Sequence, residues 1–347
     1  MAYSINAKDH FKVKLWTGTG SENAITGIGF QPDFTWIKNR AASENHKLYD
    51  AVRGVTKNIY SNLSNAEGTD AQSLKSFDSD GFTLGTEAAL NANGQNIVAW
   101  NWKANGAGSA NTDGSINSTA TSANTTAGIS IIKYTGTGSN ATVGHGLGSV
   151  PAMIMVKNLG GTDSWMVYHK NLHATAPEDY ILQLNTNGIA VDNATIWNDT
   201  APTSSVFSIG TDAGVNGSSA TYIAYAFAEK TGFSKFGSYT GNDVVNGPFI
   251  YCGFKPSLFL VKMVTSGSEE WSIYDNKRLG YNPAHSRLYP NTTSGESAET
   301  KLDFLSNGIK IKSAGDGHLN QSAKQYVYMA FAEAPLVGSN NIPATAR

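Results

Sequence analysis

The stretch GFQPDFTWIKNR, residues 29–40, decides the fold, because two further versions of it follow along the chain. These versions are LGSVPAMIMVKN at residues 147–158 and GFKPSLFLVKM at residues 253–263. Each has a proline, then a nearly continuous apolar run, then a lysine. Proline cannot donate to a β-ladder and so stands at the first residue of a strand, and a short apolar run is typical of a strand buried on both faces. We expect the lysine to mark the point where the chain reaches water.

The similarity extends outward from these stretches into six blocks that recur in one order. The opening blocks are FKVKLWTGTGS (11–21), ISIIKYTGTGS (129–139) and FSKFGSYTGN (233–242). The aromatic blocks are HKLYD (46–50), SWMVYHK (164–170) and EWSIYDNKR (270–278). The closing blocks are QNIVAWNWKA (95–104), TYIAYAFAEK (221–230) and QYVYMAFAEA (325–334). Asp80-Gly81 and Asn307-Gly308 stand between apolar runs and predict hairpin turns.

The closing blocks alternate strictly between large and small residues, which is the period of a β-strand packed on a core. The large residues are Val98, Trp100 and Trp102 in the first copy, Ile223, Tyr225 and Phe227 in the second, and Val327, Met329 and Phe331 in the third. The opposite face carries Ala99, Asn101, Ala224, Ala226 and Ala330. Because these residues are small and uncharged, we expect a neighbouring repeat to cover them.

These patterns predict an all-β protein of three tandem, related β-sandwich-like units, each of about six strands. The units form either separate domains or one body with approximate three-fold internal symmetry. The predicted boundaries are 1–104, 128–231 and 232–335 for the repeats, 105–127 for a Gly/Ser/Asn/Thr-rich linker or surface loop, and 336–347 for a C-terminal tail. The best candidate for a short helix is residues 51–63, although Gly54 and β-branched residues weaken it.

Composition excludes several classes of function. The 347 residues are 40% hydrophobic and 15% charged, with a net charge of −2 and no cluster of Lys and Arg, so we expect no nucleic-acid partner. Cys252 is the single cysteine, which excludes an internal disulfide and a cysteine zinc site and is interpreted as a small buried apolar residue. The N-terminus lacks the apolar region of a secretory signal, and no apolar run is long enough for a membrane span. We therefore expect a soluble protein made in a reducing compartment.

Candidate chemistry is sparse. His169 and His173 have i, i+4 spacing, but without the glutamate of a metalloprotease motif the metal interpretation is the weaker one. The glycine-rich residues 144–148 lead into a strand and lack a GK[ST] ending, so they do not predict a phosphate site. Turn formation explains the acidic residues Asp78, Asp80 and Asp113 better than calcium binding does. Ser204 and Ser205 lack a nucleophile elbow.

Recurring aromatic residues are interpreted mainly as core. Trp165 and Trp271 occupy one position of the repeat, where the first copy has His46, and a sugar-stacking platform is the alternative to a core role. Tyr49, Tyr168 and Tyr274 also align. Asp50, His169 and Asp275 follow them on the other face, where we expect solvent. We assign no catalytic residue, no metal ligand and no cofactor, and we leave the ligand-binding residues unassigned.

Several longer motifs together resemble a family of tailed-bacteriophage structural proteins common in marine and cyanobacterial phages, described as tail-fibre-like or host-specificity proteins. These motifs are FQPDFTWIKNR, HKLYDAVRG, SFDSDGFTLG, IVAWNWKA, NTDGSI, SSVFSIG, YIAYAFAEK and SKFGSYTGN. The resemblance covers the chain from its start to about Pro335. It implies a component of the virion, made in the host cytoplasm, and no catalytic or ligand residue is carried over from it.

The expected function is therefore that of a non-enzymatic tail fibre or tail-associated protein that contacts the host surface through its loops. Expected partners are other virion proteins, a host glycan or protein, and further copies of the chain, with a trimer favoured. The main alternative is a capsid decoration or head spike. A polysaccharide depolymerase is the third hypothesis, and it requires a pair of facing carboxylates in a groove.

Overall fold

The computed structural model describes residues 5–279, 281–283 and 285–335, and nearly all of its regular structure is antiparallel β-sheet. The all-β prediction is confirmed. The helical elements are single turns: η1 (Ala7–Asp9), α1 (Ala88–Asn91), η2 (Pro177–Asp179), α2 (Ala194–Trp197) and α3 (Ala213–Asn216). Residues 51–63 form no helix and instead contain strand β5 (Lys57–Tyr60). The predicted tail at residues 336–347 lies outside the described residues.

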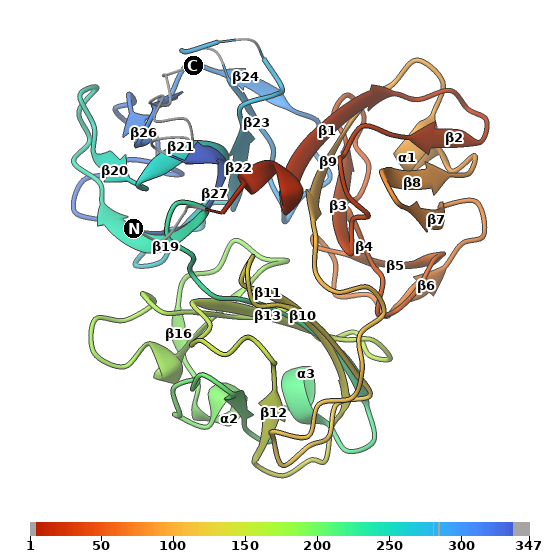
Figure 1. Ribbon diagram of the computed structural model, residues 1–347. Helices are drawn as coiled ribbons and strands as arrows, with labels where there is room; N and C mark the ends of the chain where they lie inside the picture. The colour runs from red at the N-terminus through yellow and green to blue at the C-terminus, as the bar shows by residue number, and fades with distance from the viewer. Residues whose placement is uncertain (1–4, 280, 284, 336–347) are drawn as a thin grey trace.

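Three large sheets follow one another along the chain (Figure 1). The first has the order β1 (Phe11–Thr17), β9 (Asn96–Trp102), β3 (Phe34–Asn39), β4 (Lys47–Asp50), β5 and β6 (Gly68–Thr69). The second has the order β10 (Ala120–Asn124), β11 (Ile129–Thr135), β18 (Thr221–Phe227), β13 (Met153–Asn158), β14 (Met166–His169), β15 (Tyr180–Gln183) and β16 (Val191–Asp192). The third has the order β19 (Ser234–Thr240), β27 (Gln325–Pro335), β21 (Phe254–Met263) and β22 (Ser272–Asp275).

The central strands of the three sheets pair in the same register. Phe34, Met153 and Leu258 lie opposite Trp102, Phe227 and Phe331 on one side, and opposite Asp50, His169 and Asp275 on the other. We call the parts from β1 to β9, from β10 to β18 and from β19 to β27 the first, second and third unit, and residues in the same register equivalent. The exact boundaries drawn from the sequence, and an origin by triplication, stay predictions.

A smaller sheet packs against each large one. The small sheets are β2 (Asn23–Ile25), β8 (Gly81–Leu84) and β7 (Leu74–Asp78); β12 (Ala141–Gly144) and β17 (Val206–Ile209); and β20 (Phe249–Tyr251), β26 (Gly308–Ile311) and β25 (Leu302–Phe304). A further hairpin pairs β23 (His285–Arg287) with β24 (Ser297–Glu299). Ala99 packs with Ile25 and Phe82, and Ala224 with Val143 and Phe207. The small-residue face of the closing strands is thus covered by the same unit, and the expectation that a neighbouring repeat covers it is wrong.

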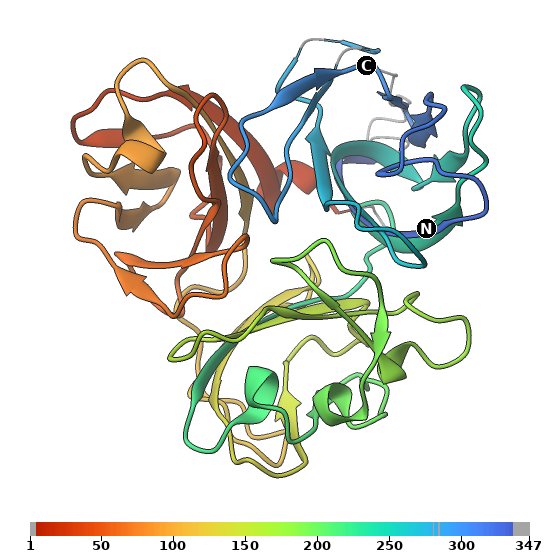
Figure 2. The same ribbon diagram turned by 180° about the vertical axis from the view of Figure 1, so that it is seen from behind.

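The large-residue face of the same strands meets the other units instead. Trp102, Phe227 and Phe331 are equivalent, almost fully buried and in mutual contact, with ring centroids 6.2, 6.0 and 5.6 Å apart. We call these three aromatic side chains the central triad. They join the units into one body, in which the three units are arranged in a ring around a common centre, as Figures 1 and 2 show from two sides. A central core therefore lies between the units, in addition to the cores inside them.

Residues 105–127 are not a free linker. Strand β10, at residues 120–124, pairs with β11 at the edge of the second sheet. Ile116, the one branched apolar residue of the segment, forms a parallel bridge to Val143 of β12, and its side chain is buried. The prediction of a linker or surface loop is therefore wrong for these parts of the segment, which pack on the second unit.

The prolines that led to the fold stand where a strand tolerates them. Pro32 and Pro151 precede β3 and β13 by two residues. Pro256 lies inside β21, at the point where the pairing with β27 shifts register. An irregularity of this kind is the place in a sheet where the missing N–H of proline costs least.

Candidate functional site

The charged and polar residues at the ends of β4, β14 and β22 hold the units together. Asp50, His169 and Asp275 are equivalent and at most 2% exposed, so the expectation that they face solvent is wrong. Each contacts the next unit in a cyclic order. Tyr225 Oη of the second unit donates to Asp50 over 2.6 Å, His169 Nε2 lies 3.1 Å from the Tyr328 carbonyl of the third, and Trp100 Nε1 of the first donates to Asp275 over 3.2 Å.

We call the interface between two neighbouring units a joint. At this position, two of the three joints contain a buried ion pair. Arg53 Nε lies 2.5 Å from Asp50 Oδ2, and Arg278 Nε lies 2.6 Å from Asp275 Oδ2, with all four side chains fully buried. Each guanidinium also donates to a backbone carbonyl, that of Leu48 or Ile273. Burial would raise the pKa of Asp275, but the Arg278 guanidinium and its hydrogen bonds hold that pKa below its usual range. The Asp275 carboxylate is therefore a structural anion.

The position equivalent to Asp50 and Asp275 is neutral in the second unit. Burial lowers the pKa of His169 to about 4, so its ring is uncharged at neutral pH. His173 lies in the following turn and stacks on Tyr180 with ring centroids 4.8 Å apart. The structure thus gives the two histidines separate partners rather than a common site. Within residues 5–279, 281–283 and 285–335, no group of three or more His, Cys, Asp and Glu side chains is placed to hold a metal ion.

The recurring tryptophans are core residues that also bridge units. Trp165 Nε1 donates to the Tyr60 carbonyl of the first unit over 2.8 Å, and Trp271 Nε1 donates to the Gln183 carbonyl of the second over 3.0 Å. Both are at most 2% exposed, as is His46 at the equivalent position. The core interpretation is confirmed, and a sugar has no access to these rings. Tyr49, Tyr168 and Tyr274 are buried as well.

The turn residues act locally, as the sequence indicates. Asp80 accepts hydrogen bonds from the backbone N–H groups of Gly27 and Gly29, which lower its pKa, and Thr83 donates to Asp78. Asp113 is held by Asn111. Gly144, at the start of the glycine-rich stretch, ends strand β12, and His145 in its middle is buried. Ser204 and Ser205 lie in the exposed bend before β17. Cys252 is buried, which raises its pKa to about 12.

Sequence reasoning missed a buried asparagine that recurs in all three units. Asn91, Asn216 and Asn320 are fully buried before the closing strand. Each side-chain oxygen accepts a backbone N–H after the opening strand, and each side-chain amide donates to two carbonyls. A repeated apolar–Asn pair, Leu90-Asn91, Val215-Asn216 and Leu319-Asn320, was the available signal.

The lysines that end the proline-led strands do not reach water. Lys38, Lys157 and Lys262 are fully buried, and each ammonium donates to the carbonyl of the next residue and to one further carbonyl. Burial lowers the pKa of each to about 8. The expectation of an exposed lysine is wrong because the following loop folds back and supplies a carbonyl oxygen to Lys38 and Lys157, and Asn187 of the second unit supplies one to Lys262.

This lowering predicts a pH-dependent stability. Between the folded pKa of about 8 and the unfolded value of about 10.4, the unfolded chain binds more protons, so the free energy of unfolding rises with pH. The slope for wild type from pH 8 to 9.5 should exceed that for Lys38→Met by up to about 1.4 kcal/mol per pH unit. Urea unfolding at each pH measures both slopes. Lys57→Met, which removes a partly exposed lysine, should keep the wild-type slope, and equal slopes for wild type and Lys38→Met would contradict the assignment.

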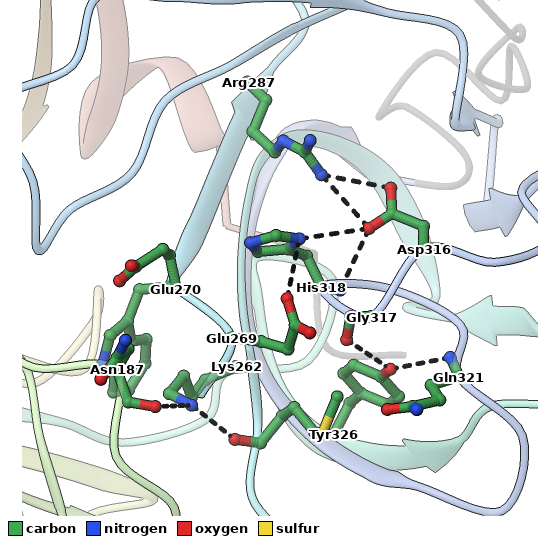
Figure 3. A network of polar contacts seen from close by, with 12 residues as sticks. Asn187, Lys262, Glu269, Glu270, Arg287, Asp316, Gly317, His318, Gln321 and Tyr326 are labelled. Carbon is green, nitrogen blue, oxygen red and sulfur yellow. Dashed lines mark hydrogen bonds and ion pairs between the residues drawn. The ribbon is translucent and has the colours of Figure 1, made fainter. Parts of the chain in front are cut away.

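A polar network ties down the loop that precedes β27 in the third unit (Figure 3). His318 Nδ1 lies 3.2 Å from Glu269 and 3.3 Å from Asp316, and Arg287 lies 3.2 Å from Asp316. Burial would raise the pKa of Asp316, but His318 and Arg287 hold it below its usual range. Tyr326 Oη donates to the Gly317 carbonyl over 2.7 Å. Glu269 and Asp316 each lie beside a side-chain nitrogen of His318 or Arg287, so the network is organised as a loop anchor.

The candidate binding site is the outer edge of strand β20 in the third unit. Phe249 and Tyr251 point away from the core on either side of the buried Ile250 and are 47% and 57% exposed. Their rings pack edge to face with centroids 6.4 Å apart. Val244 and Val245, in the loop before β20, are also exposed. We call these four residues the β20 patch.

The equivalent edge of the second unit is covered by the chain itself. Ile116 N donates to the Thr142 carbonyl of β12 over 3.0 Å, and Ser115 exchanges hydrogen bonds with Thr142. The covering residues belong to the long connection between the first and second units. Only six residues separate β18 from β19, and among the described residues no strand pairs with the other edge of β20. The third unit therefore presents both an open edge and two aromatic rings.

Comparison with known proteins identifies a family, but the description of that family gives no function. The model of one family, described as a domain of unknown function (DUF7483), matches residues 6–335. No curated protein matches the chain. Among the described residues, no helix has the length and apolar character needed to cross a membrane.

Proposed function

Because the chain belongs to the DUF7483 family, whose function is unknown, its role must be argued from its own residues, and we propose that it is a non-enzymatic structural protein of a bacteriophage virion that contacts the host surface. Within the virion we place it in the tail, as a fibre or tail-associated protein. The sequence motifs that resemble tail-fibre-like phage proteins support this placement.

The observation that carries the proposal is the β20 patch. A contiguous exposed apolar patch is typical of a binding surface, and an open strand edge is a template for association. Phe249 and Tyr251 occupy such an edge, where Ala24 of β2 and Thr142 of β12 are the small counterparts of Phe249 in the other units. The two aromatic residues are about half exposed and suit contact with a receptor.

The rest of the ring supports a display role. Ionisable side chains that could otherwise serve in catalysis, such as those of Asp50, His169 and Arg278, instead link neighbouring units and stiffen the body. A rigid scaffold with exposed loops is the usual platform for recognition. Self-association, with a trimer favoured, is part of the proposal, and it requires surfaces other than the three joints because one chain already closes them.

A competition assay tests the proposal. Purified protein, with its oligomeric state measured by light scattering, is added to host cells before the phage, and adsorption is counted. Wild type should block adsorption in a dose-dependent way. The double variant Phe249→Ser/Tyr251→Ser should need on the order of tenfold more protein for half-blocking, because buried aromatic anchors dominate binding energies.

The matched control is Ile189→Ser/Val191→Ser, which removes two exposed apolar side chains at the same spacing from the second unit. It should block as wild type does. Absence of blocking by correctly folded wild type would overturn host contact and favour a capsid or internal position. Equal blocking by all three proteins would remove the β20 patch from the proposal, and release of reducing sugar from host envelopes would show an enzyme instead.

A further inference from the structure

A polar cavity of about 190 Å³ lies between the first and third units. Its lining residues are Lys8, Phe11, Lys12, Val13, Ser257, Lys277, Ala332 and Glu333. The apolar members are almost fully buried and form its floor. The lysines come from three separate elements, namely η1, β1 and the turn after β22. The cavity is therefore built by the joint between two units.

The equivalent joint between the second and third units is closed by an ion pair. Lys235 is the equivalent of Lys12. Lys12 follows Phe11, which lies opposite Trp102, and Lys235 follows Ser234, which lies opposite Phe331. Glu229 is the equivalent of Glu333, two residues beyond the central triad. Lys235 Nζ lies 2.7 Å from Glu229, which also accepts from Lys170 over 2.8 Å. A carboxylate of one unit thus neutralises a lysine of the next.

In the joint that holds the cavity, the corresponding carboxylate is already occupied. Glu333 is engaged by Lys277 and Lys255, both from its own unit. The ammonium groups of Lys8 and Lys12 have no hydrogen-bond or ion-pair partner among residues 5–279, 281–283 and 285–335. Burial and then the neighbouring Lys277, Lys8 and Lys14 lower the pKa of Lys12, and Glu333 offsets only part of this lowering. The site therefore has one carboxylate, already paired within its own unit, for a larger number of lysines than its sister joint has.

We propose that this cavity binds the carboxylate of a small organic acid between Lys8, Lys12 and Lys277. The carboxylate would occupy the role that Glu229 has beside Lys235 in the sister joint. Charge-assisted hydrogen bonds to lysine are among the stronger polar contacts, and the volume corresponds to about six water molecules, enough for a carboxylate with a short carbon skeleton. The inference concerns a different surface from the β20 patch and stands whether or not the chain contacts a host.

Titration calorimetry with glucuronate and with glucose tests the site, because the two probes share a sugar ring and differ in the carboxylate. Glucuronate should bind wild type and glucose should not. Lys12→Gln and Lys8→Gln should each weaken glucuronate binding at least about tenfold by removing one charged donor. Two separate variants are used so that one of them can fail to fold without losing the test.

The matched control is Lys133→Gln, which removes a lysine from β11 of the second unit, away from the cavity. It should bind glucuronate as wild type does. The proposal is overturned if glucuronate does not bind, if glucose binds equally, or if folded Lys12→Gln and Lys8→Gln both keep wild-type affinity. Tighter binding of inorganic phosphate than of glucuronate would also overturn it, because the site would then not be selective for a carboxylate.

Discussion

Replacing Trp102 with alanine is expected to lower the free energy of unfolding by about 3–5 kcal/mol, the range for truncating a buried tryptophan or phenylalanine. Trp102 is 1% exposed and belongs to the central triad. Its ring contacts Phe227 of the second unit and Phe331 of the third, and it stacks on Phe34 with centroids 5.0 Å apart. Three units therefore lose packing at once, and the cavity cannot be filled by the movement of a single strand.

The units themselves provide a matched control. The second and third units have phenylalanine at the position of Trp102, so Trp102→Phe gives a triad of three identical rings. We expect it to cost clearly less than Trp102→Ala. Trp16→Ala is the second control, because Trp16 is only half-buried on the far side of the first unit.

Urea unfolding followed by circular dichroism measures all three variants, and thermal unfolding checks that one cooperative transition remains. A loss below about 1.5 kcal/mol for Trp102→Ala, or one no larger than for Trp16→Ala, would contradict a central role for the triad. Separate transitions in wild type would show that the units unfold independently of one another.

Strands and their register were predictable because period-two patterns are local. In QNIVAWNWKA the alternation of Val98, Trp100 and Trp102 with small residues determines that the segment is a strand with two different faces. The sequence could not tell which face meets the neighbouring unit, since both faces are uncharged. The large aromatic residues prove to fill the space between units, while the alanines lie against the smaller sheet of the same unit.

Residues at the joints were misjudged for a different reason. Asp50 and Asp275 each have an arginine three residues on as ion-pair partner, but the second partner of each lies in another unit, 175 residues away along the chain. A charged residue is buried only when it is paired, and no local pattern shows a partner at that distance. Lys38 was misjudged likewise, because its acceptors are backbone carbonyls, which carry no sequence signal.

The β20 patch illustrates the limit for binding sites. In GPFIYCG the consecutive apolar residues Phe249, Ile250 and Tyr251 are typical of a short buried strand, and the aromatic residues would be assigned to the core. Their exposure follows from the absence of a covering segment like the one that contains Ile116 in the second unit. That difference depends on the length of the connection between units and becomes visible only when the edges of the small sheets are compared.

Replacing the ion pair Asp50–Arg53 of the first unit by the neutral pair of the second unit should show that either pair can stabilise a joint. The second unit has His169 and Leu172 where the first has Asp50 and Arg53. Asp50→His alone removes the fully buried carboxylate from Arg53 and leaves only the partly exposed Glu67, 3.3 Å from its Nη1, so the variant should cost about 3–5 kcal/mol because breaking a buried ion pair is strongly destabilising. Tyr225 also loses its acceptor.

The double variant Asp50→His/Arg53→Leu should recover at least about 2 kcal/mol of that loss, since replacing both members of a buried ion pair by a neutral pair removes the unpaired charge. A cycle with Arg53→Leu, measured by urea unfolding at pH 7, isolates the coupling between the two positions. Glu22→His at the exposed Glu22–Lys75 pair is the control and should change stability by no more than about 0.5 kcal/mol.

A coupling energy near zero, or a double variant less stable than Asp50→His, would mean that the Asp50–Arg53 pair is not the unit that stabilises this joint. The expected recovery has a structural reason in the chain itself, because at this position His169 links the second and third units through its neutral ring and without a buried ion pair. An aspartate–arginine pair and a histidine–leucine pair would then be two solutions for one position of the ring, and joint formation would depend on satisfying each buried polar group rather than on charge.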